Sequence, residues 1–409
     1  MAWVQAPCAG EKRENALGEV LLSDFRQADL ARYEGKVQCV YADPPFLTGE
    51  EFLMRQRVGA EGWRTGKPTV TLGAYSDVFS SREEYLRLLR SLIERAHALL
   101  TDDGAFFLHL DTRADAYARL ILDEVFGEKN FVNQIIWAYQ SGGRSLRHYS
   151  RKHDVIFFYR KSRNLRFDIT QVPIARGENR QNHMKRTVDE AGRPCRTIRS
   201  GGKTYVYYDD DPVYPGDVWM DLSHLQQKDP QRTGYDTQKP ESLLRRVILP
   251  VTKPGEVVAD LCCGSGTAGV AAAALGRRFL LTDQSEAAVA VTRKRLLGQG
   301  AAFDLNAPAT EKRAKAALRL YPGIAFYDIC LDDFAPEEPL PGGVTGLDGV
   351  DQWSAGFYRE GVFYPAADWA RTKRTPDIER MLQIPLVRGT PAVLVTDIRG
   401  ERYCYVCKE

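Results

Sequence analysis

The residues whose types and order best suit chemistry are Asp43-Pro44-Pro45-Phe46, which follow an apolar run at residues 37–42. The run predicts a strand that stops at Asp43, because proline gives a β-ladder no N–H and disfavours the helical region for the residue before it. In an open α/β sheet, such a strand end lies at the edge where ligands bind. The Asp43 carboxylate, the Pro44 carbonyl and the Phe46 ring suit a planar amino group on an aromatic base, with two acceptors and one stacking face. An ordinary strand-to-loop turn is the alternative.

A second candidate site begins at a glycine turn, residues 264–267, which follows the mostly apolar residues 257–261 and precedes a helix predicted over residues 268–275. Glycines let the backbone approach a ligand closely, and the first turn of a helix offers free N–H groups. The next apolar run, residues 278–282, ends at Asp283, where a carboxylate is placed to hold ribose hydroxyls. A dinucleotide-binding fold and a plain strand-to-helix connection are the alternatives for this pattern.

A third stretch, Tyr235-Asp236-Thr237-Gln238-Lys239-Pro240-Glu241, opens a helix predicted over residues 241–248. The three stretches, in this order, resemble the β class of amino-group DNA methyltransferases. The extended forms at residues 41–49 and 237–244 are similar to Mod-like adenine-specific methyltransferases of restriction–modification systems. The resemblance covers roughly residues 16–297. One departure is Leu261-Cys262, where the family usually carries Pro-Phe.

The resemblance implies an α/β fold of the Rossmann-like, S-adenosylmethionine-dependent methyltransferase type, with a mostly parallel seven-stranded sheet and one antiparallel strand. It divides the chain into a methyltransferase domain with a catalytic half at residues 16–161 and a cofactor-binding half at residues 232–305. Between the halves, residues 162–231 are expected to form a basic insert that recognises the DNA target. Residues 320–409 are expected to form a small, mainly-β C-terminal module.

The resemblance also implies roles for individual residues. The expected catalytic set is Asp43, Pro44, Pro45 and Phe46. The expected cofactor-binding set is Asp24, Phe25, Thr237, Lys239, Asp260, Cys262, Gly264, Ser265, Gly266, Thr267 and Asp283. Within this set, Lys239 is expected to meet the methionine carboxylate and Asp283 the ribose. For Asp24, the N-cap of a helix predicted over residues 25–33 is the alternative, and His109, at another strand end, has a buried core position as its alternative.

The implied reaction moves a methyl group from S-adenosylmethionine to the N6 amino group of adenine in double-stranded DNA and leaves S-adenosylhomocysteine. The base must leave the duplex stack to be reached, and no metal is expected because the sulfonium is already activated. Two alternatives remain. One is N4-cytosine methylation, for which the family's corner more often begins with Ser, so that Asp43 favours adenine. The other is a DNA-binding relative that has lost catalysis.

Charge is distributed unevenly along the 409 residues, although the net charge is only +2. Basic residues predominate over acids from Arg144 to Lys203, a pattern typical of phosphate contacts. The candidate DNA contacts are Arg144, Arg147, Arg151 and Lys152. A solvated charged face is the alternative. Acids accumulate after Tyr321, which argues against broad DNA contact there.

The chain has 8 cysteines, including a Cys-x-x-Cys pair at Cys404 and Cys407. One such pair without a second is a weak zinc signal, so we expect free thiols and no metal. No apolar run approaches the ~20 residues of a membrane span, and the start does not resemble a signal peptide. We expect a cytoplasmic protein that binds double-stranded DNA and no membrane, as a homodimer or as a subunit of a restriction or defence system.

Periodicity predicts the elements that position these residues. Helices are expected over residues 81–100, 114–126 and 285–297, a buried strand over 104–110, and an antiparallel pair over 131–139 and 154–159. Residues 1–15 are expected to be loosely held, residues 48–80 to form a long loop that closes over the DNA, and residues 311–318 to form a helical connector. Short strands are expected at residues 357–358, 362–364, 392–396 and 403–406.

Overall fold

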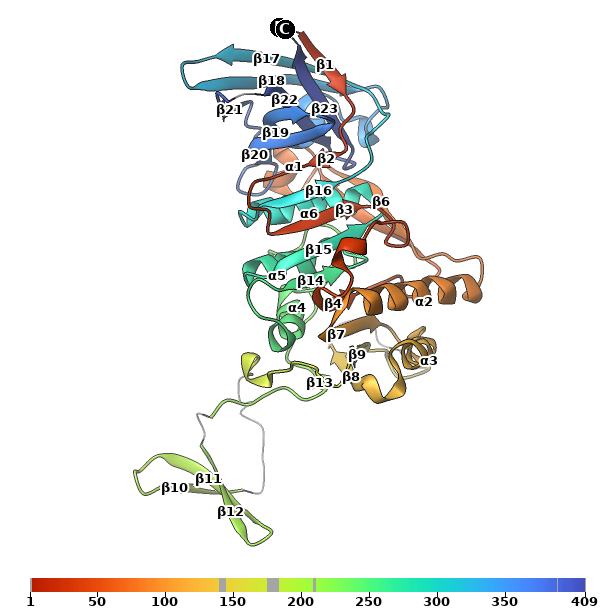
Figure 1. The fold of residues 1–409 in the computed structure, drawn as a ribbon, viewed down its shortest axis with the longest axis vertical. Coiled ribbons are helices and arrows are strands. Elements are labelled where there is room, and N and C mark those ends of the chain that lie inside the picture. Colours follow the sequence, from red (N-terminus) through yellow and green to blue (C-terminus); the bar gives the residue numbers. More distant parts are fainter. Residues whose placement is uncertain (1, 140–144, 175–183, 209–210, 388, 409) are drawn as a thin grey trace.

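The computed structural model describes residues 2–139, 145–174, 184–208, 211–387 and 389–408. In these ranges, one continuous fifteen-stranded sheet runs along the length of the molecule, with helices on both sides of its central part (Figure 1). The strand order is β1-β23-β22-β19-β20-β2-β16-β3-β15-β14-β4-β7-β9-β8-β13.

The central part of this sheet has the predicted methyltransferase topology. Its consecutive strands β3, β15, β14, β4, β7, β9 and β8 run parallel, except that β9 is antiparallel to both of its neighbours. In that order, their bounds are Gly18–Leu22, Arg278–Asp283, Val257–Asp260, Val37–Ala42, Leu100–Leu110, His153–Arg160 and Phe131–Ala138. This mostly parallel sheet with one antiparallel strand confirms the fold class and the antiparallel pair.

Two hydrophobic cores lie on opposite faces of the sheet, because the side chains of a strand point alternately to its two faces. Cys39 and Tyr41 of β4 pack with α4, α5 and α6, whereas Val40 and Ala42 pack with α2 and α3. These helices are α2 (Arg82–Leu99), α3 (Asp115–Phe126), α4 (Glu241–Ile248), α5 (Thr267–Ala274) and α6 (Glu286–Gly298). The helices predicted in these segments are confirmed.

The sheet continues past β3 into the C-terminal region. β16 (Phe303–Asn306) is parallel to β3, and β2 (Gly10–Glu11) links β16 to β20 (Val362–Ala370). Beyond them lie β19 (Val350–Arg359), β22 (Thr390–Asp397), β23 (Arg402–Lys408) and β1 (Ala2–Ala6). A second sheet joins β17 (Ala314–Pro322), β18 (Phe326–Pro336) and β21 (Met381–Pro385). The four short strands predicted here are confirmed as parts of β19, β20, β22 and β23.

Two predictions about this region are wrong. Residues 311–318 do not form a helical connector, because most of this segment belongs to β17, where Ala316, Leu318 and Leu320 pack on the C-terminal core at every second position. That spacing is the period of a strand. The first residues are not loose either, since β1 pairs along its whole length with β23. The partner strand lies at the other end of the chain, so no local pattern announces it.

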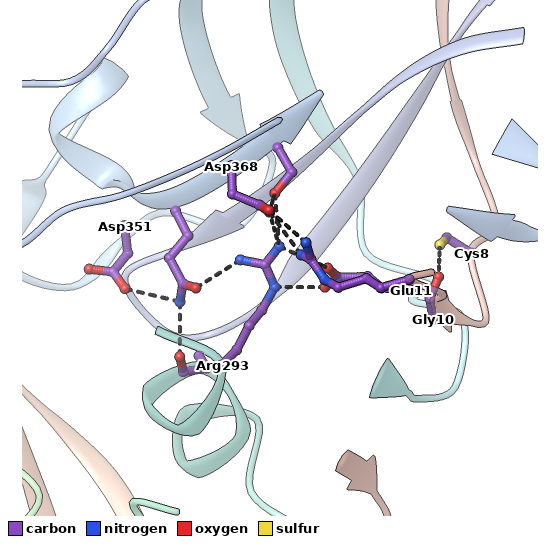
Figure 2. A network of polar contacts seen from close by, with 10 residues as sticks. Cys8, Gly10, Glu11, Arg293, Asp351 and Asp368 are labelled. Atoms are coloured by element: carbon purple, nitrogen blue, oxygen red, sulfur yellow. Dashed lines mark hydrogen bonds and ion pairs between the residues drawn. The ribbon is translucent and has the colours of Figure 1, made fainter. Parts of the chain in front are cut away.

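A buried network of charged side chains ties the C-terminal strands to α6 (Figure 2). Arg293 of α6 donates to the two oxygens of Glu11 at 2.7 and 2.8 Å, to Gln352 Oε1 at 2.9 Å and to Ser354 Oγ at 2.8 Å. Asp368 of β20 accepts a further bond from Arg293 at 3.2 Å. Buried charges are tolerated when they are paired in this way. The network therefore joins β2, α6, β19 and β20.

The prediction of a long loop at residues 48–80 is also wrong. β5 (Glu51–Arg57) and β6 (Thr69–Ser76) form an antiparallel hairpin, with α1 (Gly59–Thr65) between them. The hairpin is held by the C-terminal region, where Asp351 Oδ1 accepts from Gln56 Nε2 at 2.7 Å and Asp377 pairs with Arg64. The contacts that order this segment again come from residues distant in the sequence.

Residues 185–208 form a separate three-stranded antiparallel sheet that projects from the body (Figure 1). Its strands are β10 (Lys185–Val188), β11 (Pro194–Ser200) and β12 (Lys203–Tyr208). In the described ranges they pair only with one another, and we call this sheet the arm. The chain returns through β13 (Val218–Trp219), which is parallel to β8.

The short 3-10 helices span Ala31–Tyr33, Glu128–Asn130, Ile169–Gln171, Leu249–Val251, Pro341–Gly343 and Gly346–Gly349. Within the described parts of the chain, no helix is long and apolar enough to cross a membrane.

Candidate active site

A pocket lies at the carboxyl edge of the parallel strands, where β4, β14 and β15 end. It is lined by nearly all the residues predicted to bind the base or the cofactor: Asp24, Phe25, Asp43, Pro44, Pro45, Phe46, Thr237, Lys239, Asp260, Cys262, Gly264, Ser265, Thr267 and Asp283. Gly266 lies outside this lining. Three motifs that are far apart in the sequence therefore meet at one edge of the sheet.

Gly266 shapes the turn behind the pocket wall. It has φ +74°, and a Cβ there would lie 2.5 Å from Thr292 Oγ1, so any side chain would collide. Gly264, with φ +49°, also adopts a left-handed conformation that favours glycine. With Gly269, these glycines satisfy the Gly-x-Gly-x-x-Gly spacing of dinucleotide-binding turns. The glycine spacing alone therefore does not distinguish a dinucleotide from S-adenosylmethionine as the expected ligand.

Asp43, which follows the last residue of β4, lines the pocket, and we call the part of the pocket around it the base end after its predicted role. Its Oδ2 accepts from Lys239 Nζ at 2.6 Å, whereas its Oδ1 is buried and has no hydrogen-bond partner among the described residues. Leaving a buried acceptor unsatisfied costs about 1–3 kcal/mol. Oδ1 can thus accept from a donor that the described residues do not supply. Lys239, expected at a cofactor carboxylate, is bonded to Asp43 here, and its Nζ lies 5.1 Å from the centre of the Phe46 ring.

A buried set of side chains supports Phe46 from behind. The ring of His109 stacks on Phe46 with a centroid distance of 6.0 Å and an interplanar angle of 29°. His109 Nδ1 lies 2.8 Å from the Tyr41 hydroxyl, and Nε2 lies 3.1 Å from Asp154 Oδ2. His109 is fully buried and lies outside the pocket lining. It is therefore a core histidine that supports the ring.

Asp283 ends β15, which lies on the other side of β14 from β4, and we call the part of the pocket around it the cofactor end after its predicted role. Its Oδ2 accepts from Gly264 N at 2.8 Å, and its Oδ1 accepts from Ser285 N at 2.9 Å. A carboxylate has about four lone-pair positions, so each oxygen can accept a further hydrogen. Burial raises the pKa of Asp283 above its ordinary value, and the backbone hydrogen bonds from Ser285 and Gly264 oppose this rise.

Asp260 ends β14, between β4 and β15, and it lines the pocket together with Cys262. Asp260 Oδ1 accepts from Cys262 N at 3.1 Å, and burial raises the pKa of the Asp260 carboxyl well above its ordinary value. Cys262 lines the pocket, and burial likewise raises the pKa of its thiol, which favours the neutral form. All 8 cysteines of the chain are free thiols, as predicted.

Two residues of α6 hold the glycine turn from behind, and the sequence analysis missed both. Thr292 Oγ1 donates to Gly264 O at 3.1 Å. Arg295 Nη1 donates to Ser265 O at 2.7 Å and to Thr267 Oγ1 at 2.9 Å. Their spacing of three places them on one face of the helix. That spacing is visible in the sequence, but only the packing of α6 shows that it faces the turn.

An aromatic wall closes one side of the pocket. The rings of Phe52 and Tyr75 are 4.8 Å apart with an interplanar angle of 13°, and those of Tyr75 and Tyr235 are 6.4 Å apart at 17°. All three residues line the pocket. Tyr235 could have been predicted as a pocket residue because it is the first residue of the third motif. Phe52 and Tyr75 could not, because the hairpin that carries them was not predicted.

Asp24 and Phe25 line the pocket beside the end of β3. The Asp24 carbonyl accepts from the N–H groups of Gln27 and Ala28 at 2.9 Å, but no α-helix follows, since the helix predicted over residues 25–33 is reduced to a 3-10 turn at Ala31–Tyr33. The side-chain hydrogen bond from Arg26 holds the pKa of Asp24 below its ordinary value.

The candidate DNA contacts belong to the segment that joins β8 to β9. Because β8 runs parallel to β4 and β7, this segment leaves the sheet at the same edge as the pocket. Arg147 and Arg151 are exposed, Lys152 is half-buried, and Tyr149 is 99% exposed. Arg144 lies outside the described residues. We call residues 145–152 the basic loop. Among the residues that the structure describes, no group of His, Cys, Asp and Glu side chains is arranged to hold a metal ion.

Comparison with known proteins gives consistent matches. The chain is 25% identical over 248 residues to the DNA adenine methyltransferase YhdJ of Escherichia coli strain K12, which covers 60% of this chain and 70% of that protein. It is 26% identical over 208 residues to the type II methyltransferase M.BglII of Bacillus subtilis, which covers 48% of this chain and 52% of that protein. It is 27% identical over 214 residues to the Mod subunit of the type III restriction–modification enzyme EcoPI of Escherichia phage P1, which covers 45% of this chain and 33% of that protein.

Among solved structures, the PvuII DNA methyltransferase, described as cytosine-N4-specific, matches over 71% of this chain and 90% of that chain, at 13% identity and a TM-score of 0.46. The family model described as DNA methylase, of the N6/N4 type, matches residues 37–294, which is more than half of the chain and includes the corner at residues 43–46, the third motif and the glycine turn. The chain therefore belongs to the N6/N4 family of amino-group DNA methyltransferases.

Proposed function

We propose that the chain transfers a methyl group from S-adenosylmethionine to the N6 amino group of adenine in double-stranded DNA, after the base has left the stack. The observation that carries this proposal is the buried Asp43 Oδ1, which has no partner among the described residues, in a pocket that Phe46 also lines. An exocyclic amino group supplies the missing donor, and its base supplies the aromatic face for Phe46.

The chain's own residues orient the amino group. Asp43 and the Pro44 carbonyl each accept a hydrogen bond from one of its two N–H groups. These two bonds direct the nitrogen lone pair toward the cofactor end. This action is orientation and electrostatic stabilisation, and it does not require Asp43 to remove a proton before transfer. Asp43 as the first residue of the corner favours adenine, and the similarity to a protein named as a DNA adenine methyltransferase supports the same target.

The cofactor end fits S-adenosylmethionine, which supplies a methyl group on a positively charged sulfur. Asp283 has lone pairs left for two ribose hydroxyls after its two backbone bonds. The rings of Phe52, Tyr75 and Tyr235 provide flat apolar surface beside the glycine turn. Lys239 donates to Asp43 through its ammonium group, and the carboxylate of a ligand can compete with Asp43 for that group.

Double-stranded DNA is held by the basic loop and the arm. One face of the arm combines positive and aromatic groups, because Arg196 is paired across the strands with Tyr207 and with Arg186. Tyr205 and Tyr207 are exposed there. Such a face suits phosphate and base contacts. The similarity to a Mod subunit supports a restriction–modification setting. We propose that the chain acts in the cytoplasm, as a homodimer or beside a nuclease subunit.

Mass analysis of nucleosides tests the proposal. The chain is incubated with unmethylated duplex DNA and S-adenosylmethionine carrying a deuterated methyl group, and the DNA is then digested. We expect labelled N6-methyl-2′-deoxyadenosine. Labelled N4-methyl-2′-deoxycytidine would establish the cytosine alternative, and DNA binding without any labelled nucleoside would identify a relative that has lost catalysis.

A further inference from the structure

Asp77, the residue that follows β6, is fully buried and lines the pocket. It has no role in the reaction proposed above. Its carboxylate faces the backbone just after the catalytic corner. Oδ2 accepts from Phe46 N at 3.1 Å and from Thr48 N at 2.9 Å, and Oδ1 accepts from Leu47 N at 2.9 Å. The Thr48 hydroxyl donates to Oδ2 at 2.6 Å. Four donors thus converge on one carboxylate.

This arrangement is an anion site made from successive backbone N–H groups, and Asp77 supplies the anion. Such a concavity requires a left-handed residue, and Leu47 has φ +60°. A leucine rarely adopts that conformation, so the turn needs an external partner to hold it. Charge-assisted hydrogen bonds from three N–H groups and one hydroxyl are such a partner.

The ends of the hairpin are closed at the same place. Gly49 N donates to Asp77 O at 3.2 Å, and Asp77 N donates to Glu50 O at 3.0 Å. The side chain and the backbone of Asp77 therefore both tie the hairpin to the corner. The hairpin is in turn bonded to the C-terminal region through Gln56 and Asp351.

We infer that Asp77 is a positioning residue for methyl transfer: by holding the N–H groups of Phe46, Leu47 and Thr48, it fixes the Phe46 ring and the acceptors at Asp43 and Pro44 in the geometry that the target base requires. The kinetic part of this inference rests on the proposed function. Its structural part concerns the turn alone and is tested without any reaction.

Amide hydrogen exchange measured by mass spectrometry tests the structural part with Asp77→Asn. A peptide that begins at Asp43 reports mainly Phe46, Leu47 and Thr48, because Pro44 and Pro45 have no amide hydrogen. We expect exchange in this peptide to be at least about tenfold faster in the variant, and exchange in α2 to be unchanged, since the loss is local. Unchanged exchange in the corner peptide would overturn the inference.

Single-turnover methylation and cofactor titration test the kinetic part. We expect Asp77→Asn to lower the transfer rate about 10- to 100-fold and to change the dissociation constant for S-adenosylmethionine by less than about threefold. A parental rate, or an equal loss of rate and cofactor affinity, would overturn the positioning role. If the parent chain transfers no methyl group, the proposed function fails, whereas the exchange result still decides whether Asp77 holds the turn.

Thr48 offers a matched pair of substitutions that does not depend on how well Asp77→Asn folds. Thr48→Val removes the hydroxyl that bonds to Asp77, and Thr48→Ser keeps it. We expect a rate loss of about 3- to 10-fold for Val and less than about twofold for Ser, since one of four donors is removed. Equal rates for the two variants would contradict the inference. Asp377→Asn, which breaks an exposed ion pair to α1, is the control and should leave the rate unchanged.

Discussion

At the base end of the pocket, Asp43 has one oxygen bonded to Lys239 and one buried oxygen without a partner in the described chain, whereas at the cofactor end both oxygens of Asp283 accept backbone N–H groups. The Asp283 carboxylate is fixed by the fold and has lone pairs to spare. The Asp43 carboxylate is held through one oxygen only, and its other, buried oxygen has no partner among the described residues. This difference indicates that the two carboxylates serve different ligands, so their substitution should affect different measurements.

The largest effect is expected at the base end, for Asp43→Ala. The substitution removes a charged acceptor worth about 1.5–3 kcal/mol or more, which at about 1.36 kcal/mol per decade is a loss of roughly 10- to 100-fold or more in transfer rate. Cofactor affinity should hardly change, because Asp43 faces the base. Single-turnover methylation beside cofactor titration on the same variant measures both quantities.

Asp111→Ala is the matched control for that experiment. Asp111 also follows a strand of the sheet, β7, but it lies outside the pocket lining and pairs with Arg113. The control should transfer methyl groups at nearly the parental rate. If Asp43→Ala also kept the parental rate, Asp43 would be a strand-ending turn residue and the contrast between the two ends would disappear.

The next effect is expected at the cofactor end, for Asp283→Ala. Loss of a charged hydrogen-bond acceptor should weaken S-adenosylmethionine binding by about 1.5–3 kcal/mol. The transfer rate at saturating cofactor should fall much less than in Asp43→Ala. Titration calorimetry measures the affinity, and an unchanged value would remove Asp283 from the ribose site.

A smaller effect is expected outside both ends, in the basic loop. Replacing Arg147, Arg151 and Lys152 together with neutral residues should weaken DNA binding and flatten its salt dependence, by about 0.9 in the logarithmic slope for each DNA phosphate that the variant no longer neutralises. Cofactor affinity should stay the same. The control triple is Lys373, Arg374 and Arg380, which has the same composition and is exposed in the C-terminal region. Equal salt slopes for the two triples would mean that the duplex lies elsewhere.

The smallest effect is a pH dependence that belongs to the cofactor end alone. Burial raises the pKa of Asp283, so this carboxyl takes up a proton at a less acidic pH than the ~3.9 of an exposed aspartate. Protonation removes the negative acceptor, and S-adenosylmethionine affinity should therefore begin to fall, as the pH is lowered, at a less acidic pH than an exposed aspartate would require. Asp283→Asn carries no titrating group and should show a flatter profile. The same slope in both proteins would assign the pH dependence to another residue.

Much of this site could be predicted from the sequence because its signals are local. The apolar run before Asp43, the run before Asp283 and the glycine turn between residues 264 and 267 each define a strand end or a helix start within a few residues. Parallel strands bring their carboxyl ends to one edge of the sheet. The order of the motifs along the chain was thus enough to predict a shared pocket.

The tertiary structure decided what depends on partners distant in the sequence. The N-terminus forms β1 because β23, at the other end of the chain, provides its pairing. The hairpin at residues 51–76 is ordered by packing and hydrogen bonds to the C-terminal region. Local periodicity contains no information about such partners, and so the contacts of Asp77 with the corner and of Lys239 with Asp43 appear only once the chain is folded.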